Sequence, residues 1–172
     1  MEVLRFKQSI RKERSNTAAF VRLMIKQRGK ITVMSIQQNF TDFNRLVLRH
    51  QEEAYTLAFY TLGDERQACE TVQKVVAEAF RHPANGNFQL RILQGVSNIC
   101  SRSTTHSVDP NVVPEIVRQL SCIPLQERLA VVLIDILGLN YAQAAQVCRQ
   151  SKDQLSRILA QARVHLLYQQ PV

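Results

Sequence analysis

The sequence predicts an all-α protein built from two small helical domains joined by a short linker. The 172 residues include only five glycines and five prolines, and apolar residues recur at helical rather than strand-like spacing in most segments. Hydrophobic residues make up 45% of the chain, an ordinary fraction for a folded protein that argues against general disorder. A chain of this length can hold one ordinary domain or two small ones.

The net charge of +8 is concentrated at the N-terminus. Residues 1–33 carry nine Lys and Arg against two Glu, whereas residues 34–172 carry 13 basic and 12 acidic residues. The body of the protein is therefore nearly neutral, and its total charge is weak evidence for a nucleic-acid partner. The basic extension, residues 1–33, allows a helix over about Val3 to Gln27. Three interpretations of it stay open: a solvated tail, an arm that touches nucleic acid, or residues that precede a true translation start at Met34.

Residues 34–102 are predicted to form a bundle of three helices. The side chains of Thr41–Asp42 are suited to cap the start of the first helix, and Gly63 ends it. Asp64, with Gln67 three residues later, forms a capping-box pattern that begins the second helix.

A third helix, from about Phe88 to Arg102, completes this bundle. Residues 103–112 are polar and have no apolar period, so they are the predicted linker. Residues 113–172 are predicted to form a second helical domain. It begins with a brief helix, followed by a strongly apolar helix that Pro124 opens and Gly138 ends.

The remainder of this domain has the pattern of a helix-turn-helix. Asn140 with Gln143 predicts the capped start of a short helix, and a turn follows at Arg149–Gln150. Ser151 with Gln154 predicts the cap of a longer amphipathic helix. A short helix, a tight turn and a longer helix match the geometry in which a recognition helix enters the major groove of DNA.

The turn and the first residues of the longer helix carry the side chains that we expect to face DNA. Gln and Arg can form paired hydrogen bonds with adenine and guanine edges, and Lys and Arg neutralise phosphates. The predicted DNA-contacting residues are Arg149, Lys152, Gln154, Ser156 and Arg157. Arg163 adds a fourth positive charge to this patch, against one negative charge from Asp153. The alternative interpretation, a solvated charged face on an ordinary helix, stays open because periodicity does not exclude it.

Two sets of segments resemble the sigma subunits of bacterial RNA polymerase, in particular the small extracytoplasmic-function (ECF) class. The segments that resemble sigma region 4 are Leu120–Arg128 (LSCIPLQER), Gly138–Ala145 (GLNYAQAA) and Ser151–Arg163 (SKDQLSRILAQAR). The segments that resemble region 2 are Arg49–Tyr55 (RHQEEAY), Leu62–Asp64 (LGD) and Glu70–Gln73 (ETVQ). Both sets follow the order and spacing of the family, and together they cover residues 34–168.

This resemblance implies a promoter-recognition subunit, with promoter DNA and the RNA polymerase core as partners and an anti-sigma factor as a further one. In the family, region 2 docks on the polymerase clamp and opens the −10 element, while region 4 reads the −35 element and binds the flap. The residues that the resemblance assigns to the −10 strand are Phe88, Gln89, Arg91, Asn98 and Arg102. Those that it assigns to the clamp are Glu70 and Gln73, and the recognition-helix residues would approach the −35 element.

The chain departs from the family pattern where promoter opening is concerned. It has no Trp, Lys74 stands where Glu is usual, and the Arg-rich end of the third helix is reduced to Ser101–His106. Stacking on an aromatic side chain contributes about 1–3 kcal/mol per base, so the missing aromatic weakens the capture of unstacked bases. Two hypotheses stay open: a transcription initiation subunit, or a relative that binds polymerase or a regulator without opening promoters.

The residue pattern offers little support for an enzyme. The four histidines lie on separate predicted segments, and no nucleophile–base pair, Gly-rich phosphate loop or metal-ligand spacing is found, so we expect no cofactor. The cysteines form no CxxC pair and lie among apolar neighbours, so we expect reduced, buried thiols and a cytoplasmic location. They are Cys69, Cys100, Cys122 and Cys148. We find no apolar run of about 20 residues that would span a membrane, and no secretory signal pattern.

Overall fold

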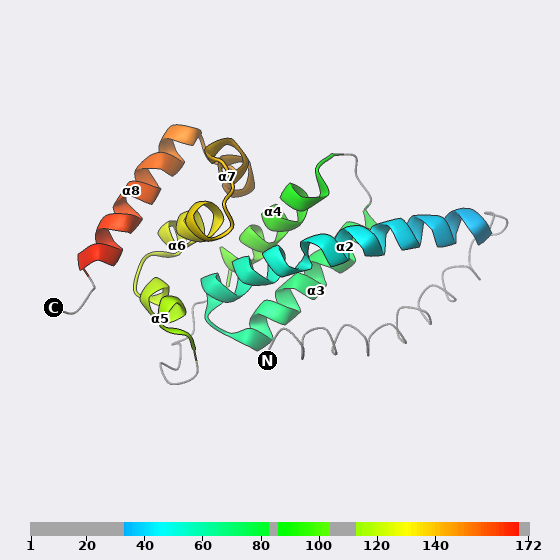
Figure 1. The fold of residues 1–172 in the computed structure, drawn as a ribbon, viewed down its shortest axis with the longest axis horizontal. Coiled ribbons are helices and arrows are strands. Elements are labelled where there is room, and N and C mark those ends of the chain that lie inside the picture. Colours follow the sequence, from blue (N-terminus) through cyan, green and yellow to red (C-terminus); the bar gives the residue numbers. More distant parts are fainter. Residues whose placement is uncertain (1–32, 83–85, 104–112, 169–172) are drawn as a thin grey trace. The chain divides into compact units, whose positions relative to one another are not determined.

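The structure, a computed structural model, describes residues 33–82, 86–103 and 113–168, and every regular element in these ranges is a helix (Figure 1). The all-α prediction is therefore confirmed. The helices are α2 (Val33–Leu62), α3 (Glu65–Arg81), α4 (Phe88–Cys100), α5 (Glu115–Ser121), α6 (Leu125–Val131), the π-helix η1 (Val132–Ile136), α7 (Tyr141–Cys148) and α8 (Lys152–Tyr168). The helix expected over Val3 to Gln27 and nearly all of the predicted linker lie outside the described residues.

The start of α2 differs from the prediction. The sequence predicts a cap at Thr41–Asp42, but the helix is already formed at Val33. Asp42 instead accepts a hydrogen bond from Arg45 within the helix, at 3.4 Å. The end of α2 is as predicted, because Gly63 adopts a left-handed conformation with φ of 73° that terminates the helix.

The last turns of α2 pack with α3 and α4 around one set of apolar side chains. Both later helices begin at a side-chain cap: Asp64 accepts from the Gln67 N–H at 2.6 Å, and Asn87 accepts from the Leu90 N–H at 3.2 Å. The buried side chains of this group are Ala54, Leu57, Ala58, Leu62, Ala68, Val72, Val75, Ala79, Leu90, Ile92, Leu93, Val96 and Cys100. This core holds α4 in place, and α4 carries most of the residues that the resemblance assigns to the −10 strand.

Helices α5 to α8 contribute the remaining buried apolar side chains, and α7 also packs against α4. These side chains are Val117, Leu120, Ile123, Leu129, Ala130, Val131, Val132, Leu133, Leu139, Ala144, Ala145, Val147, Leu155, Leu159 and Ala162. The prediction of one regular helix from Pro124 to Leu137 is corrected, because α6 passes into η1, where the Leu137 N–H bonds to the carbonyl of Val132 at 2.9 Å. Leu167, near the end of α8, lies outside this core and is 70% exposed.

Buried Arg128 connects the end of α2 to the end of α5. Its Nη1 donates to the carbonyl of Thr61 at 2.5 Å, and its Nη2 donates to the carbonyls of Ser121 at 2.9 Å and Ile123 at 3.2 Å. The last carbonyls of a helix lack partners within the helix, so one guanidinium here satisfies acceptors at two helix ends. Burial lowers the pKa of Arg128, which shows that desolvation opposes the charge that these hydrogen bonds stabilise.

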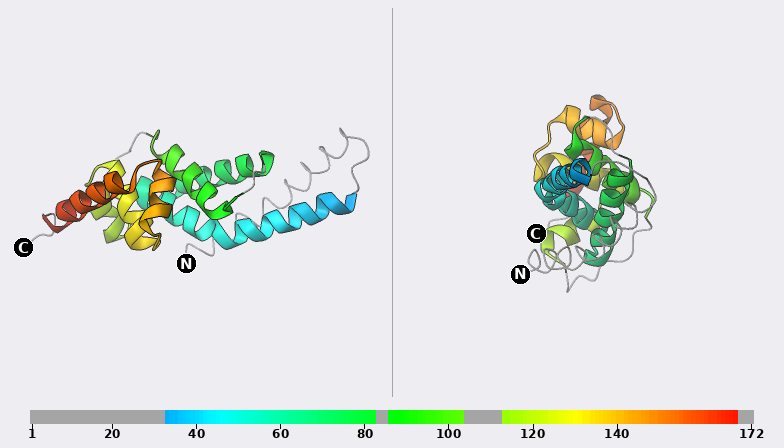
Figure 2. Two further views of the ribbon diagram at one scale, coloured as in Figure 1. Left: turned by 90° about the horizontal axis from the view of Figure 1, so that it is seen from above. Right: turned by 90° about the vertical axis from the view of Figure 1, so that its right-hand side faces the viewer.

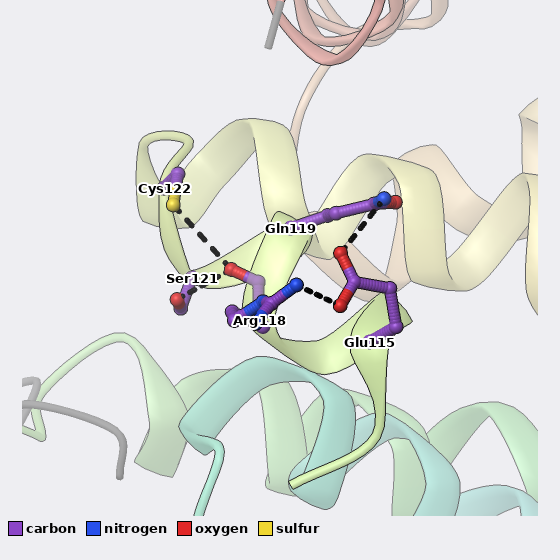
Figure 3. Close-up of polar contacts among 5 residues, drawn as sticks. All are labelled: Glu115, Arg118, Gln119, Ser121 and Cys122. Atoms are coloured by element: carbon purple, nitrogen blue, oxygen red, sulfur yellow. Dashed lines mark hydrogen bonds and ion pairs between the residues drawn. The ribbon is translucent and has the colours of Figure 1, made fainter. Parts of the chain in front are cut away.

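None of the four cysteines forms a disulfide, and they are not all buried. Cys100 is buried, which raises the pKa of its thiol to about 12, and half-buried Cys148 has a pKa raised to about 11 by the same cause. Cys69 is also half-buried, whereas Cys122 is exposed, contrary to the prediction. Cys122 lies at the end of α5, where its Sγ and the hydroxyl of Ser121 both donate to the carbonyl of Arg118 (Figure 3). Among the described helices, none is long and apolar enough to cross a membrane.

Replacing Gly95 by alanine is expected to destabilise the contact between α3 and α4. A Cβ at this position would lie 2.8 Å from Cγ1 of Val75, and valine is stiff at χ1 and cannot easily move away. Overpacking costs about 1–3 kcal/mol, whereas alanine gains about 1 kcal/mol over glycine in a helix. We expect a net loss of roughly 1 kcal/mol in urea unfolding. The cost should vanish in a Val75→Ala background, and an equal or higher stability of Gly95→Ala alone would contradict the close packing.

Replacing Arg128 by lysine is expected to cost about 2–4 kcal/mol of unfolding free energy, because a lysine ammonium cannot reach all three carbonyls that the planar guanidinium bonds. Thermal and urea unfolding measure this loss. The control is Arg118→Lys, which changes an exposed arginine on α5 and should leave stability unchanged. A loss in Arg128→Lys no larger than in the control would show that the hydrogen bonds of Arg128 contribute little.

Candidate nucleic-acid interface

Helix α7 ends in a left-handed corner that separates it from α8. The Gln150 N–H bonds to the carbonyl of Ala145 at 3.0 Å, and the Arg149 N–H bonds to that of Gln146 at 3.3 Å, which is the pattern of a Schellman motif. Arg149 has φ of 54° and ψ of 43°. The predicted turn at Arg149–Gln150 is therefore confirmed, and Figures 1 and 2 show α8 leaving α7 as a separate rod.

Both capping boxes predicted for the helix-turn-helix are present. Asn140 Oδ1 accepts from the Gln143 N–H at 3.0 Å while Gln143 Oε1 accepts from the Asn140 N–H at 3.1 Å. At the start of α8, Ser151 Oγ accepts from the Gln154 N–H at 3.2 Å, and Gln154 Oε1 accepts from the Ser151 N–H at 3.1 Å. A paired contact with adenine uses both ends of the glutamine amide, so such a contact would compete with the capping box for Oε1 of Gln154.

The first turns of α8 present polar side chains to solvent. Leu155, Leu159 and Ala162 are buried, whereas Lys152 and Arg157 are exposed, as are Asp153, Ser156 and the preceding Arg149. Among the described residues, no ion pair involves Arg149, Lys152 or Arg157. Their charges are therefore available to an anionic partner such as a phosphate backbone.

Arg163 does not extend this basic patch as the sequence suggests. Its Nη2 lies 2.6 Å from Oδ1 of Asp135, and its Nε lies 3.2 Å from Oδ2, in a two-point ion pair. The hydrogen bond to Asp135 is the main cause that raises the pKa of Arg163. The basic patch with unpaired charges thus consists of Arg149, Lys152 and Arg157.

The residues assigned to the −10 strand gather on α4, and two at its start are engaged within the protein. Gln89 Nε2 donates to Oε2 of Glu53 at 2.8 Å, and the same oxygen lies 3.3 Å from Nδ1 of His50. Half-buried Phe88 has the guanidinium carbon of Arg91 at 5.5 Å from its ring centroid, within cation–π range. This end of α4 therefore combines an aromatic ring, a cation and a polar cluster.

The face of α4 that contains Arg91 and Asn98 also contacts α7. Gln94 lies three and four residues from these two positions, so the three share one helix face. Its Nε2 donates to the carbonyl of Gln146 in α7, at 3.2 Å. Asn98 is half-buried, and exposed Arg102 follows the end of the helix. In this structure α7 therefore occupies part of the face that the resemblance assigns to the −10 strand.

The residues assigned to the polymerase clamp lie on α3, on a different element from the other two groups. Glu70 is exposed and accepts a hydrogen bond from Arg66 at 3.0 Å, whereas Gln73 is half-buried. Glu70 and Gln73 are three residues apart and so share one face of the helix. The predicted site residues thus fall into three groups, on α3, on α4 and around the start of α8.

Sequence reasoning missed the residues that hold these groups in position. They include Arg128, the pair Asp135–Arg163, and Glu127, whose Oε2 lies 2.6 Å from Nδ1 of His165. Charged residues within the apolar run of residues 125–137 were a signal, because a charge buried in such a helix needs a partner. The partners lie 28 and 38 residues away along the chain, and no local pattern identifies them.

No known family profile matches the chain, and no curated protein matches it in sequence. Three solved structures share its fold. CnrH in complex with the cytosolic domain of CnrY has a TM-score of 0.65 and 20% identity over 73% of this chain and 85% of the other. The sigma factor RpoE with the anti-sigma factor NepR from Bartonella quintana has a TM-score of 0.60 and 16% identity over 74% and 96%.

The third structure is the anti-anti-sigma factor PhyR with NepR from the same organism, with a TM-score of 0.60 and 14% identity over 73% of this chain. This chain corresponds to about half of that protein, 49% of its length. At such identities the comparisons establish the fold, which is sigma-like. They support the resemblance drawn from the sequence at the level of architecture.

Replacing Arg149 by glycine is expected to stabilise the protein. A left-handed conformation costs a non-glycine residue about 1–2 kcal/mol, so glycine should raise the unfolding free energy by roughly 1 kcal/mol. Arg149→Ala is the matched variant, because it removes the same charge and keeps the strain. Unfolding measurements that place the glycine and alanine variants at equal stability would contradict the strain at this corner.

Proposed function

We propose that this chain is a sequence-specific DNA-binding transcription initiation factor, a sigma-like subunit that directs RNA polymerase to promoters. The observation that carries the proposal is the start of α8, where Lys152, Ser156 and Arg157 are exposed to solvent while Leu155 and Leu159 of the same helix are buried. The left-handed corner before α8 projects this end of the helix, as the recognition helix of a helix-turn-helix requires. The sigma-like fold supplies the same architecture around it.

In this proposal the three groups of residues have separate tasks. Arg157 and Ser156 approach base edges of a −35-like element, and Arg149 and Lys152 contact phosphates. Gln154 acts first as the cap that fixes the start of α8. Glu70 and Gln73 of α3 face the polymerase core, the α4 residues handle the −10 strand, and no catalytic step is assigned to the protein.

A second function, that of a protein-interaction module without promoter opening, is favoured by the state of α4. Gln89 is bonded to Glu53, and α7 occupies part of the face that contains Arg91 and Asn98. The chain also lacks the Trp that the family uses in melting. A relative with these features would bind the polymerase or a regulator, such as an anti-sigma factor, and leave the promoter closed.

Run-off transcription with bacterial core polymerase separates these functions. The template is a duplex that the full chain and core polymerase together enrich from a randomised pool. The proposal predicts transcripts from this template and none from a scrambled one. Polymerase binding with no template-specific transcript would establish the interaction module instead.

Replacing Arg157 by alanine is expected to lower affinity for the enriched duplex about tenfold or more if Arg157 reads a base edge. If it contacts a phosphate instead, affinity should fall equally on the enriched and scrambled duplexes, and the slope of log K against log salt should decrease by about 1. Arg118→Ala, which removes one exposed positive charge from α5, is the control and should change neither quantity. Unchanged binding and transcription in Arg157→Ala would contradict the assigned role of α8.

A further inference from the structure

We propose that Arg163 is a positioning residue, whose ion pair with Asp135 acts together with the Glu127–His165 pair to fix the rotation of α8 about its own axis. This inference rests on the proposed DNA-binding function and deepens it. It assigns Arg163 to orienting the DNA-contacting end of α8, and not to contacting DNA itself.

The Asp135–Arg163 ion pair connects one side of α8 to η1. Two nitrogens of Arg163 bond to the two carboxylate oxygens of Asp135, at 2.6 and 3.2 Å, and such two-point pairs restrict orientation more than a single contact does. Asp135 lies in η1, where the π-helical turn sets the position of its side chain. Tyr141, the first residue of α7, also contributes to the raised pKa of Arg163.

The Glu127–His165 pair connects the other side of α8 to α6. Glu127 is nearly buried, with 10% of its side chain exposed, and its Oε2 lies 2.6 Å from Nδ1 of His165. His165 follows Arg163 by two residues, which places the two side chains about 200° apart around the helix axis. Because α6 and η1 are continuous, a single rigid segment holds α8 from two nearly opposite sides. Rotation of α8 in either direction would break one of these contacts.

The rotation of α8 decides which side chains face DNA. Arg163 lies 11 residues after Lys152, a distance of about 16 Å along the axis with an angular offset of only about 20°. Ser156 lies on the same strip of the helix. Any rotation at Arg163 is thus transmitted to Lys152 and Ser156. The buried side chains that anchor α8, Leu155, Leu159 and Ala162, form one stripe along the helix, and the two charged pairs add to the restraint on rotation that this stripe provides.

A set of charge reversals tests this role against direct contact with a phosphate. The variants are Asp135→Arg, Arg163→Asp and the double exchange, measured as the full chain on the enriched and scrambled duplexes. Positioning predicts that Asp135→Arg weakens binding to the enriched duplex about tenfold although it adds positive charge. Arg163→Asp should weaken it similarly, and the double exchange should restore affinity to within about threefold of the wild type.

A phosphate contact predicts the opposite pattern and would overturn the inference. Asp135→Arg would then tighten binding, and the double exchange would stay as weak as Arg163→Asp alone. Asp135→Asn, a smaller change, covers the case in which a reversal does not fold: positioning predicts weaker specific binding although a negative charge is removed. The exposed pair Glu115–Arg118 of α5 (Figure 3) supplies the control, because reversing both of its charges should leave DNA affinity unchanged.

Hydrogen exchange without DNA separates failure of this inference from failure of the proposed function. Positioning predicts faster amide exchange in the first turns of α8 in each single reversal, with protection restored in the double exchange. If the wild type shows no preference for any duplex, the proposed function fails, yet restored protection would still support the fixed rotation of α8. Exchange that is equal in all variants would overturn the inference whatever the DNA result.

Discussion

The left-handed backbone of Arg149 is the constraint on which the rest of the structure depends. The N–H groups of Arg149 and Gln150 bond to carbonyls of α7 and close its end, and the chain then turns before Ser151 caps α8. If Arg149 were helical, α7 and α8 would form one continuous rod and the capping box at Ser151 would not exist. Leu155 and Leu159 could then not pack against α6. Lys152 and Arg157 would lie in the middle of a long helix, whereas a recognition helix contacts the major groove with its first residues.

The parts of the fold that follow from local chemistry could be predicted from the sequence. The caps at Asp64, Asn140 and Ser151 and the turn at Arg149–Gln150 are determined by residues within four positions of one another. The start of α2 could not be predicted in this way, because Thr and Asp favour caps but do not exclude a helix that passes through them. The π-helical turn of η1 also escaped prediction, since one inserted residue scarcely changes the apolar period of so short a segment.

The solvent exposure of the candidate site residues could be predicted from the sequence, but their hydrogen-bond partners in other helices could not. The polar start predicted for an amphipathic helix after the turn correctly indicates that Lys152, Ser156 and Arg157 are exposed, because polar positions of such a helix lie outside its apolar face. The same pattern counted Arg163 as part of the basic patch. Its pairing with Asp135, like that of Gln89 with Glu53, joins residues 28 and 36 positions apart. Such contacts depend on how helices pack, and packing is not encoded in any short window of sequence.

The two candidate DNA surfaces differ in the structural rearrangement that DNA binding would require. The start of α8 is exposed as it stands, whereas access to the α4 face requires α7 to move away from Gln94. The helices on the two sides of this contact are also joined by Arg128, which bonds to carbonyls at the ends of both α2 and α5. Separating these helices would leave the guanidinium of Arg128 and the carbonyls that it bonds without partners. Each polar group that stays buried without a partner would then raise the free energy of the separated state. A −35-like contact can therefore form without rearrangement, while any contact of α4 with a −10 strand needs binding energy from a partner such as the polymerase to drive the opening.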